Sequence, residues 1–380
     1  MRQDSIVCFA NDWHNDPTSK HQVMKLLSKT HKILWINSIG LRRPSLTAHD
    51  ALRIAKRLRG VAAGVEKISE NLYVLSPLVI PFHKHRSVRK LNQKLLVFQV
   101  KYYLKKLGMR DIELWSFIPS MKDVVGKLGE RIVIYYCVDD WSKFSFVDSE
   151  SVAEMEADLV RKSDIVIASA RSLYEQKKIL NANTHLVSHG VDYAHFSQAL
   201  LDDYPVPEDV RALPKPVIGF FGLIHEWIDL SLIKKVAQSH PEWSIVMIGK
   251  VSADISELRE LANVIFLGQK GYKELPGYCK AFDVAIIPFV INELTKSVNP
   301  IKLREYLAAG LDVVSVNLPE VESYHGFVRI SKNEGEFIRN IELSLAGRDN
   351  QEKRKRSRGM ANEDWKSKVT EIRKIVSSSR

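Results

Sequence analysis

Thr295-Lys-Ser-Val-Asn-Pro-Ile-Lys-Leu-Arg-Glu-Tyr-Leu-Ala-Ala-Gly310 leads directly into the apolar run Asp312–Val316. Asn299 is a good N-cap, Pro300 suits the first helical position, and Gly310 suits the C′ position just beyond a helix. We therefore predict a helix of about ten residues followed by a strand. This alternation decides the fold because it recurs along the chain.

Short apolar runs alternate with helical patterns in both halves of the sequence. They are rich in Val, Ile and aromatic residues and lack strict polar alternation, which is typical of strands buried on both faces of a parallel sheet. The runs in the first half are Ile6–Ala10, Lys32–Asn37, Tyr73–Pro77, Ile112–Phe117, Arg131–Val138 and Asp164–Ser169. Those in the second half are Val217–Gly222, Trp243–Gly249, Asn263–Gly268, Asp283–Phe289, Asp312–Val316 and Phe327–Ser331. We predict an α/β fold with two Rossmann-like domains facing across a cleft.

Composition suggests where the domains divide. Residues 201–216 hold four prolines among acidic residues, which disfavours a helix and predicts an interdomain linker. We expect a first domain over residues 1–200 and a second over residues 217–355. A helix over residues 356–380 is expected to pack back on the first domain. Ligands bind at the carboxyl ends of strands in such domains, so the informative loops are those that follow strands.

The charge of the chain is concentrated in one segment. The chain has 56 Lys and Arg against 45 Asp and Glu, a formal charge of +11. Sixteen of these cations and three acids lie in the basic segment 41–110, which alone carries +13. Such a face predicts attraction to an anionic membrane surface. We expect no nucleic-acid partner, because the sequence has neither a recognition motif nor zinc-ligand spacing.

Two stripes within the basic segment suit a membrane surface. In Thr47–Ala62 the apolar residues fall on one helical face with cations around it, as in an interfacial helix. The second stripe consists of Val88, Leu91, Leu95, Phe98 and Tyr102. Helices that face a protein core more often carry such stripes, and this is the competing interpretation.

The cysteines and the apolar stretches indicate the compartment. Cys8, Cys137 and Cys279 lie far apart without metal-ligand spacing, which fits a reducing compartment and predicts no metal site. No apolar stretch approaches the roughly 20 residues of a membrane span. We therefore expect a cytoplasmic protein with at most peripheral membrane contact.

The helix that follows Asn299 offers an anion site. Free N–H groups at its amino end attract phosphate, and Lys302 adds a positive charge. Glu305 follows three residues later on the same side, where its carboxylate can accept hydrogen bonds from two ribose hydroxyls. An ordinary surface ion pair between Lys302 and Glu305 is the competing interpretation.

Two other loops in the second half follow apolar runs. Gly222 would let a ligand approach the backbone closely, and His225 and Glu226 come just after it. Lys250 follows the next run, where its charge suits phosphates or simply faces solvent.

The first half offers candidates for sugar binding and proton transfer. Asp12 and His14 flank Trp13, and this combination suits a sugar because an aromatic ring stacks on C–H groups while acids bind hydroxyls. An ordinary turn explains the loop equally well. Asp139 and Asp140 end another run, where paired acids could supply a general base or cap the next helix.

Together these motifs resemble GT-B glycosyltransferases of the family-4 type, in particular the branch that builds capsular, teichuronic-acid or exopolysaccharide chains. The residues that carry the resemblance are Asn299–Lys302, Glu305–Gly310, Gly222, and His189-Gly-Val-Asp192 followed by Phe196. The resemblance covers nearly the whole chain and is strongest from Val217 to Val316.

The resemblance implies that a nucleotide-diphosphate sugar binds mainly to the second domain. Glu305 would hold the ribose, and the helix start at Asn299 and Pro300 would take the diphosphate near Gly222. Ser297 stands where the family usually has a glutamate that contacts the sugar.

The resemblance also shows where this chain departs from the family. His225-Glu226-Trp227 replaces the family's usual basic residue, which leaves Lys302 and Lys250 as phosphate-binding charges. Ser116 and Asp139 stand where relatives often carry a histidine facing the acceptor.

The implied activity is a metal-independent, retaining transfer of a sugar to a glycan or lipid-linked acceptor in cell-surface polysaccharide synthesis, without a cofactor. Inversion with Asp139 or Asp140 as the base stays open. A nucleotide-sugar epimerase of the same fold is the second candidate. We expect the enzyme at the inner face of the cell membrane.

Overall fold

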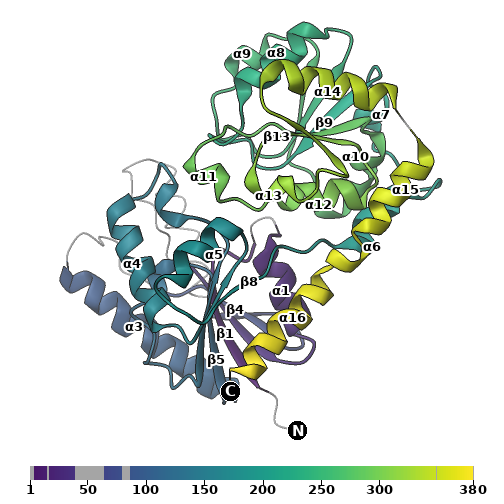
Figure 1. Ribbon diagram of the computed structural model, residues 1–380. Helices are drawn as coiled ribbons and strands as arrows, with labels where there is room; N and C mark the ends of the chain where they lie inside the picture. The colour runs from purple at the N-terminus through teal and green to yellow at the C-terminus, as the bar shows by residue number, and fades with distance from the viewer. Residues whose placement is uncertain (1–3, 15–16, 39–63, 79–85, 348, 380) are drawn as a thin grey trace. The chain divides into compact units, whose positions relative to one another are not determined.

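The computed structural model describes residues 4–14, 17–38, 64–78, 86–347 and 349–379. The chain divides into two compact units, each built on one sheet (Figure 1). The first unit combines Met1–Ser188 with Val369–Arg380, and the second is His189–Lys368. The expectation of two Rossmann-like α/β domains is confirmed.

The first unit contains an eight-stranded sheet with the order β3-β4-β2-β1-β5-β6-β7-β8. Its strands are β1 (Ser5–Ala10), β2 (Lys32–Asn37), β3 (Val65–Ser69), β4 (Leu72–Leu75), β5 (Ile112–Ser116), β6 (Ile132–Cys137), β7 (Ile165–Ala168) and β8 (Thr184–Leu186). All neighbours pair in parallel except β3, which runs antiparallel to β4. The sequence did not predict β3 or β8, because the first is a partly exposed edge strand and the second has only three residues.

Helices cover both faces of this sheet, with α1 (Ser19–Leu27) and α16 (Trp365–Ser378) on one face (Figure 1). The opposite face carries α3 (Arg86–Lys106), α4 (Ser149–Lys162) and α5 (Arg171–Lys178). In α16, Ile372 and Val376 are fully buried, which confirms that the C-terminal helix packs back on the first unit.

The second unit contains a parallel six-stranded sheet with the order β11-β10-β9-β12-β13-β14. Its strands are β9 (Val217–Phe221), β10 (Ser244–Ile248), β11 (Val264–Gly268), β12 (Val284–Ile287), β13 (Val313–Val316) and β14 (Val328–Ser331), each within a predicted run. Its helices are α6 (Tyr193–Phe196), α7 (Glu208–Arg211), α8 (Leu230–Ser239), α9 (Ser256–Arg259), α10 (Leu275–Ala281), α11 (Glu293–Lys296), α12 (Ile301–Ala308), α13 (Pro319–Glu322), α14 (Glu334–Ala346) and α15 (Asn350–Gly359). Helices α8, α9 and α14 cover one face, and α10, α12 and α13 cover the other (Figure 1).

Each sheet has a point at which its strand order reverses direction. In the first unit this point lies between β1 and β5, and in the second it lies between β9 and β12. Loops that leave the carboxyl ends of strands at such a point diverge and leave room for a ligand. Both reversal points therefore position candidate sites.

The predicted linker 201–216 lies inside the second unit, which already begins at His189. The Lys280 ammonium donates to the carbonyl oxygens of Leu201, Asp202 and Tyr204 at 2.7, 2.7 and 2.9 Å. The Tyr278 hydroxyl donates to Asp209 at 3.0 Å. The prolines prevent a long helix here, but they do not prevent the segment from packing against α10.

Candidate functional site

The predicted helix after Asn299 is present as α12, but its N-cap residue is Pro300. The Asn299 side chain lies elsewhere: it accepts a hydrogen bond from Arg304 Nη1 at 2.5 Å and donates to Glu320 at 2.6 Å. Gly310 ends the helix as predicted, at φ +80°. Two hydrogen bonds close a Schellman motif there, from Gly310 N–H to Leu307 O and from Leu311 N–H to Tyr306 O.

Lys302 and Glu305 lie on one side of α12, as the sequence predicted. The Lys302 Nζ is 3.5 Å from Glu305 Oε2 and 5.3 Å from the centre of the Phe221 ring. Burial raises the pKa of the Glu305 carboxyl, and the charge of Lys302 lowers it in part. Oε2 of Glu305 is buried and accepts no hydrogen bond from any described residue. A buried carboxylate oxygen with spare acceptor capacity is suited to bind a hydroxyl.

Two glycines bring the carboxyl ends of β9 and β10 close to α12. Gly222 and Gly249 have φ values of +151° and +142°, which L side chains rarely adopt. A Cβ atom on Gly249 would lie 1.9 Å from the Gly222 carbonyl oxygen, and one on Gly222 would lie 3.1 Å from Lys302 Cε. The structure therefore brings Gly222 together with Lys302 and, through it, with Glu305.

The other predicted donor-side residues lie on the loops that follow β9 and β10 and at the end of α11. Lys250 is exposed, and its carbonyl oxygen accepts from Ile224 N–H at 3.0 Å. His225 stacks on Trp227 at 4.5 Å between ring centres, whereas the neighbouring Glu226 is exposed. Ser297 is buried at the end of α11, where its N–H donates to Leu294 O.

Two polar residues near Glu305 were not predicted as site residues. The charge of His195 lowers the pKa of Glu305 and that of Asp192 raises it, after the larger effects of burial and Lys302. His195 stacks on Tyr272 at 4.6 Å and contacts the Tyr272 carbonyl oxygen through Nε2 at 2.9 Å. The signal was the motif that ends at Asp192, whose side chain caps α6 by accepting from His195 N–H.

In the first unit, Asp139 and Asp140 follow β6 and differ in environment. Asp140 is buried and accepts a hydrogen bond from the Ser142 hydroxyl at 2.8 Å. Burial raises the pKa of Asp139, while the charge of Lys20 lowers it. Lys20 was missed because a lysine near the start of a helix gives no sign that the fold will bury it. Ser116 is also buried and donates to the Ile118 carbonyl oxygen at 2.8 Å.

Asp12 and His14 are exposed, and neither forms a hydrogen bond or ion pair with Asp139 or Asp140 within the described part of the chain. Asp12 Oδ1 accepts from His14 N–H at 3.1 Å, and His14 Nε2 lies 2.8 Å from Glu66. These contacts fit the turn interpretation.

Trp13, which was expected to stack on a sugar, is buried instead. It packs against Trp35 and His21, with ring centres 4.9 Å away in each case. Burial lowers the pKa of His21 to about 4, so this ring is neutral near pH 7. Its Nδ1 accepts from Thr18 N–H, which leaves Nε2 to donate to the Trp13 carbonyl oxygen at 3.0 Å. The tryptophan and histidine therefore hold the loop in place.

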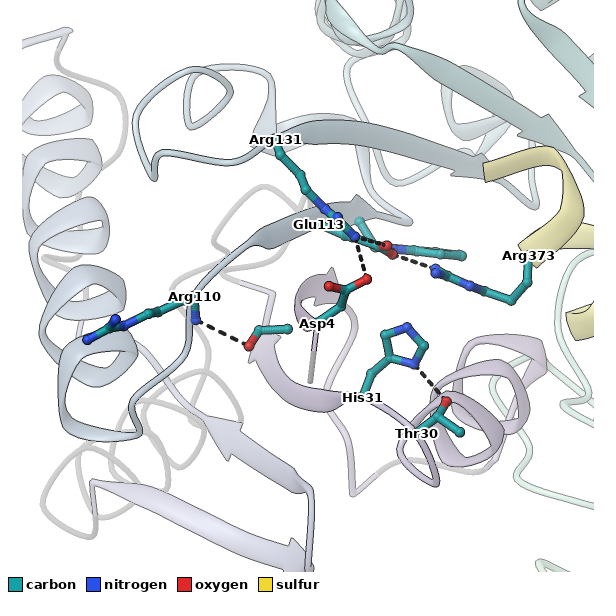
Figure 2. Close-up of polar contacts among 9 residues, drawn as sticks. Asp4, Thr30, His31, Arg110, Glu113, Arg131 and Arg373 are labelled. Carbon is teal, nitrogen blue, oxygen red and sulfur yellow. Dashed lines mark hydrogen bonds and ion pairs between the residues drawn. The ribbon is translucent and has the colours of Figure 1, made fainter. Parts of the chain in front are cut away.

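One cluster of metal-ligating residues lies near the amino ends of strands in the first sheet (Figure 2). Ligand atoms of Asp4, His31 and Glu113 lie within 4.8 Å of one another. Arg131 Nη2 pairs with Asp4 at 2.7 Å and with Glu113 at 2.8 Å, and Arg373 Nη1 pairs with Glu113 at 2.6 Å. Two guanidinium groups already neutralise both carboxylates, so the cluster fits an anchor for α16 better than a cation site.

Residues 215–347 match the family model described as Glycosyl transferases group 1. The whole fold matches sucrose-phosphate synthase from Thermosynechococcus elongatus, with a TM-score of 0.70, 14% identity, and coverage of 99% of this chain and 98% of that one. Residues 215–347 therefore resemble the group 1 glycosyltransferases, and the chain has the GT-B fold.

Two further proteins resemble this chain. A Bacillus subtilis (strain 168) protein described as a teichuronic acid biosynthesis glycosyltransferase is 30% identical over 222 residues, which are 54% of this chain and 55% of that protein. The match thus spans about half the length of this curated relative. The Anabaena protein HepE, solved in complex with UDP-glucose, has a TM-score of 0.68 at 14% identity, over 98% of this chain and 99% of that one.

Proposed function

We propose that this protein moves a sugar from a nucleotide-diphosphate sugar to a glycan acceptor in cell-surface polysaccharide synthesis. One observation carries the proposal: in a group 1 domain, the buried Glu305 has an unused acceptor oxygen beside Lys302, where the strand order reverses. The complex of HepE with UDP-glucose and the teichuronic acid role given for the Bacillus relative support the choice of donor and pathway.

Each donor-side residue has a defined role in this proposal. Glu305 accepts hydrogen bonds from the ribose hydroxyls, while Lys302 and the amino end of α12 hold the diphosphate. Ser297 and Lys250 lie on the neighbouring loops, and Gly222 leaves room for the phosphates. During transfer the anomeric C–O bond to the diphosphate breaks and a C–O bond to an acceptor hydroxyl forms. The nucleoside diphosphate departs with the electron pair of the broken bond, and its departing oxygen takes up the proton of the acceptor hydroxyl.

We also propose that the transfer needs no metal ion and retains the anomeric configuration. Lys302 and the α12 dipole supply positive charge to the leaving diphosphate, a role that a metal ion fills in other enzymes. Retention rests on the resemblance to family 4. Anomeric NMR of the product, with assays in the presence and absence of EDTA, tests both points.

The acceptor is proposed to be lipid-linked and reached at the inner face of the cell membrane. No described helix is both long and apolar enough to cross a bilayer. The solvent-facing side of α3 supports a peripheral contact: Leu91, Phe98 and Tyr102 are 47%, 69% and 54% exposed, with Lys94 and Lys101 beside them. The core-facing interpretation of this stripe is therefore wrong for those three residues. The other stripe, Thr47–Ala62, lies outside the described residues.

A thermal-shift screen of UDP-, GDP- and TDP-sugars tests the proposed donor site. We expect one nucleotide class to raise the melting temperature of the wild type and to have little effect on Glu305→Ala. The matched control is Glu322→Ala, which removes an exposed carboxylate of α13 and should respond like the wild type. An unchanged melting temperature with every nucleotide sugar would exclude this function.

A further inference from the structure

Lys20 is a buried cation with unused hydrogen-bonding capacity. Its side chain is on α1, which follows β1 at the reversal point of the first sheet, and the residue is only 5% exposed. Among described residues, the ammonium donates one hydrogen bond, to Asn11 Oδ1 at 3.0 Å, and lies 5.2 Å from the centre of the Trp141 ring. An ammonium group has three donors, and a buried donor without an acceptor is costly.

Asp139 has the matching unused capacity. It follows β6 at the same carboxyl edge of the sheet, and its carboxylate accepts no hydrogen bond from the described residues. The charges of Lys20 and Asp139 act on each other, yet no ion pair within 4.0 Å joins them. Burial lowers the pKa of Lys20 and raises that of Asp139, so both are partly withdrawn from water.

Trp141 adds a third unused polar group at this place. Its indole Nε1 is buried and has no hydrogen-bond partner in the described structure. The half-buried rings of Trp141, Phe144 and Phe146 form a row, with ring centres 5.8 and 5.2 Å apart. Aromatic faces beside polar groups suit a ligand that has both C–H faces and hydroxyls.

We propose that Lys20 and Asp139 hold one neutral hydroxyl group of the acceptor sugar between them, with Trp141 beside it. A hydroxyl group can accept a hydrogen bond from the Lys20 ammonium and donate one to the Asp139 carboxylate. A ligand carboxylate at this position would be repelled by Asp139, and a ligand ammonium would be repelled by Lys20. The site therefore selects an uncharged hydroxyl. This inference deepens the proposed function and rests on it.

Saturation-transfer NMR with methyl glycosides and their monodeoxy analogues, in saturating UDP, tests this site. The glycosides are the glucoside, the galactoside and the N-acetylglucosaminide. We expect at least one to bind the wild type and one of its deoxy analogues to bind at least about tenfold more weakly, because it loses the hydrogen bonds to two charged groups.

Variants then test whether Lys20 and Asp139 contact the hydroxyl that the deoxy analogue lacks. Lys20→Gln and Asp139→Asn should each bind the parent glycoside more weakly than the wild type does, and should distinguish it from that deoxy analogue by a smaller factor. Lys25→Gln, which removes an exposed lysine from the same helix, should behave like the wild type. The thermal shift with the nucleotide sugar should be unchanged in all three variants, which also shows that they are folded.

Three results would overturn the inference. One is that both variants bind glycosides as the wild type does. Another is that they distinguish the parent from its deoxy analogue as strongly as the wild type does, because a purely structural role would leave hydroxyl selectivity intact. The third is that no glycoside binds the wild type while a nucleotide sugar still stabilises it; this result rejects the acceptor site and leaves the donor site standing.

Discussion

The two units each place a lysine and a carboxylate at the reversal point of a sheet, but they arrange the pair differently. Lys302 and Glu305 are one turn apart on α12 and form an ion pair at 3.5 Å. Lys20 and Asp139 come from separate elements and form no ion pair within 4.0 Å. Burial raises the carboxyl pKa in both units. The closed pair is suited to a charged diphosphate and its ribose, whereas the open pair is suited to a neutral group that bridges it.

Glu113 is a buried carboxylate paired with two arginines, and breaking one of these pairs is expected to have the largest effect, on the free energy of unfolding. Burial alone would raise its pKa, but the hydrogen bond and charge of Arg373, with further contacts, outweigh it and leave the pKa below 4.5. Arg373→Ala should lower the free energy of unfolding by about 3 kcal/mol, the low end for a broken buried pair, because Arg131 remains. Urea unfolding at pH 7 measures the loss.

The pH dependence of that loss tests its cause. A depressed carboxyl pKa stabilises the fold above the ordinary value of 4.5, and this contribution disappears as the pH falls through the folded-state pKa. The gap between wild type and Arg373→Ala should therefore narrow below about pH 4.5. A gap that is constant with pH would show that lost packing, and not the ion pair, explains it.

Breaking the ion pair between Lys302 and Glu305 is expected to have the next largest effect, on donor affinity. Lys302→Met removes the cation beside Glu305 and the proposed diphosphate contact, so donor affinity should fall about a hundredfold. Lys296→Met is the matched control, because Lys296 lies on neighbouring α11 and forms its ion pair with Glu293, at 2.9 Å. Calorimetric titration of the stabilising nucleotide sugar measures both variants. Equal losses in the two would contradict a specific role for Lys302.

Lys20 and Asp139 should restrict the pH range over which the acceptor is used efficiently, as measured by kcat/KM. A bridged hydroxyl needs Asp139 ionised and Lys20 protonated, and their shifted pKa values narrow this range from both sides. Charges of Cys8, Asp140 and Glu156 also act on the pair.

We expect kcat/KM for the acceptor to fall about tenfold at each end of that range, while donor affinity changes less. Asp139→Asn should remove the acid limb. An acid limb that persists in this variant would assign it to another group.

The smallest expected effect concerns the membrane. Lys101→Gln on α3 should weaken binding to anionic vesicles about fivefold, because one cation near such a surface contributes about 1 kcal/mol. Lys235→Gln, on α8 of the second unit, should leave vesicle binding unchanged. Sedimentation with vesicles of increasing anionic lipid content separates the two. Equal binding to neutral vesicles would reject the proposed contact.

The sequence predicted most of the fold and the proximity of Lys302 to Glu305. Buried parallel strands have continuous apolar runs, so every strand of the second unit lay within a predicted run, whereas the exposed β3 and the short β8 carry no such signal. Lys302 and Glu305 were predictable because they lie on one helix, where spacing determines proximity. Lys20 and Asp139 are brought together only by the tertiary fold, which spacing along the chain does not reveal. The same limit explains Asn299, whose side chain binds Arg304 and does not cap α12.

The most direct test of the donor site is the affinity of Glu305→Gln for the stabilising nucleotide sugar and for its 2′,3′-dideoxyribose analogue. The account predicts that the substitution weakens binding of the natural donor at least tenfold and leaves binding of the analogue, which lacks both ribose hydroxyls, nearly unchanged. Equal weakening of both ligands, or of neither, would contradict a ribose-binding role for Glu305.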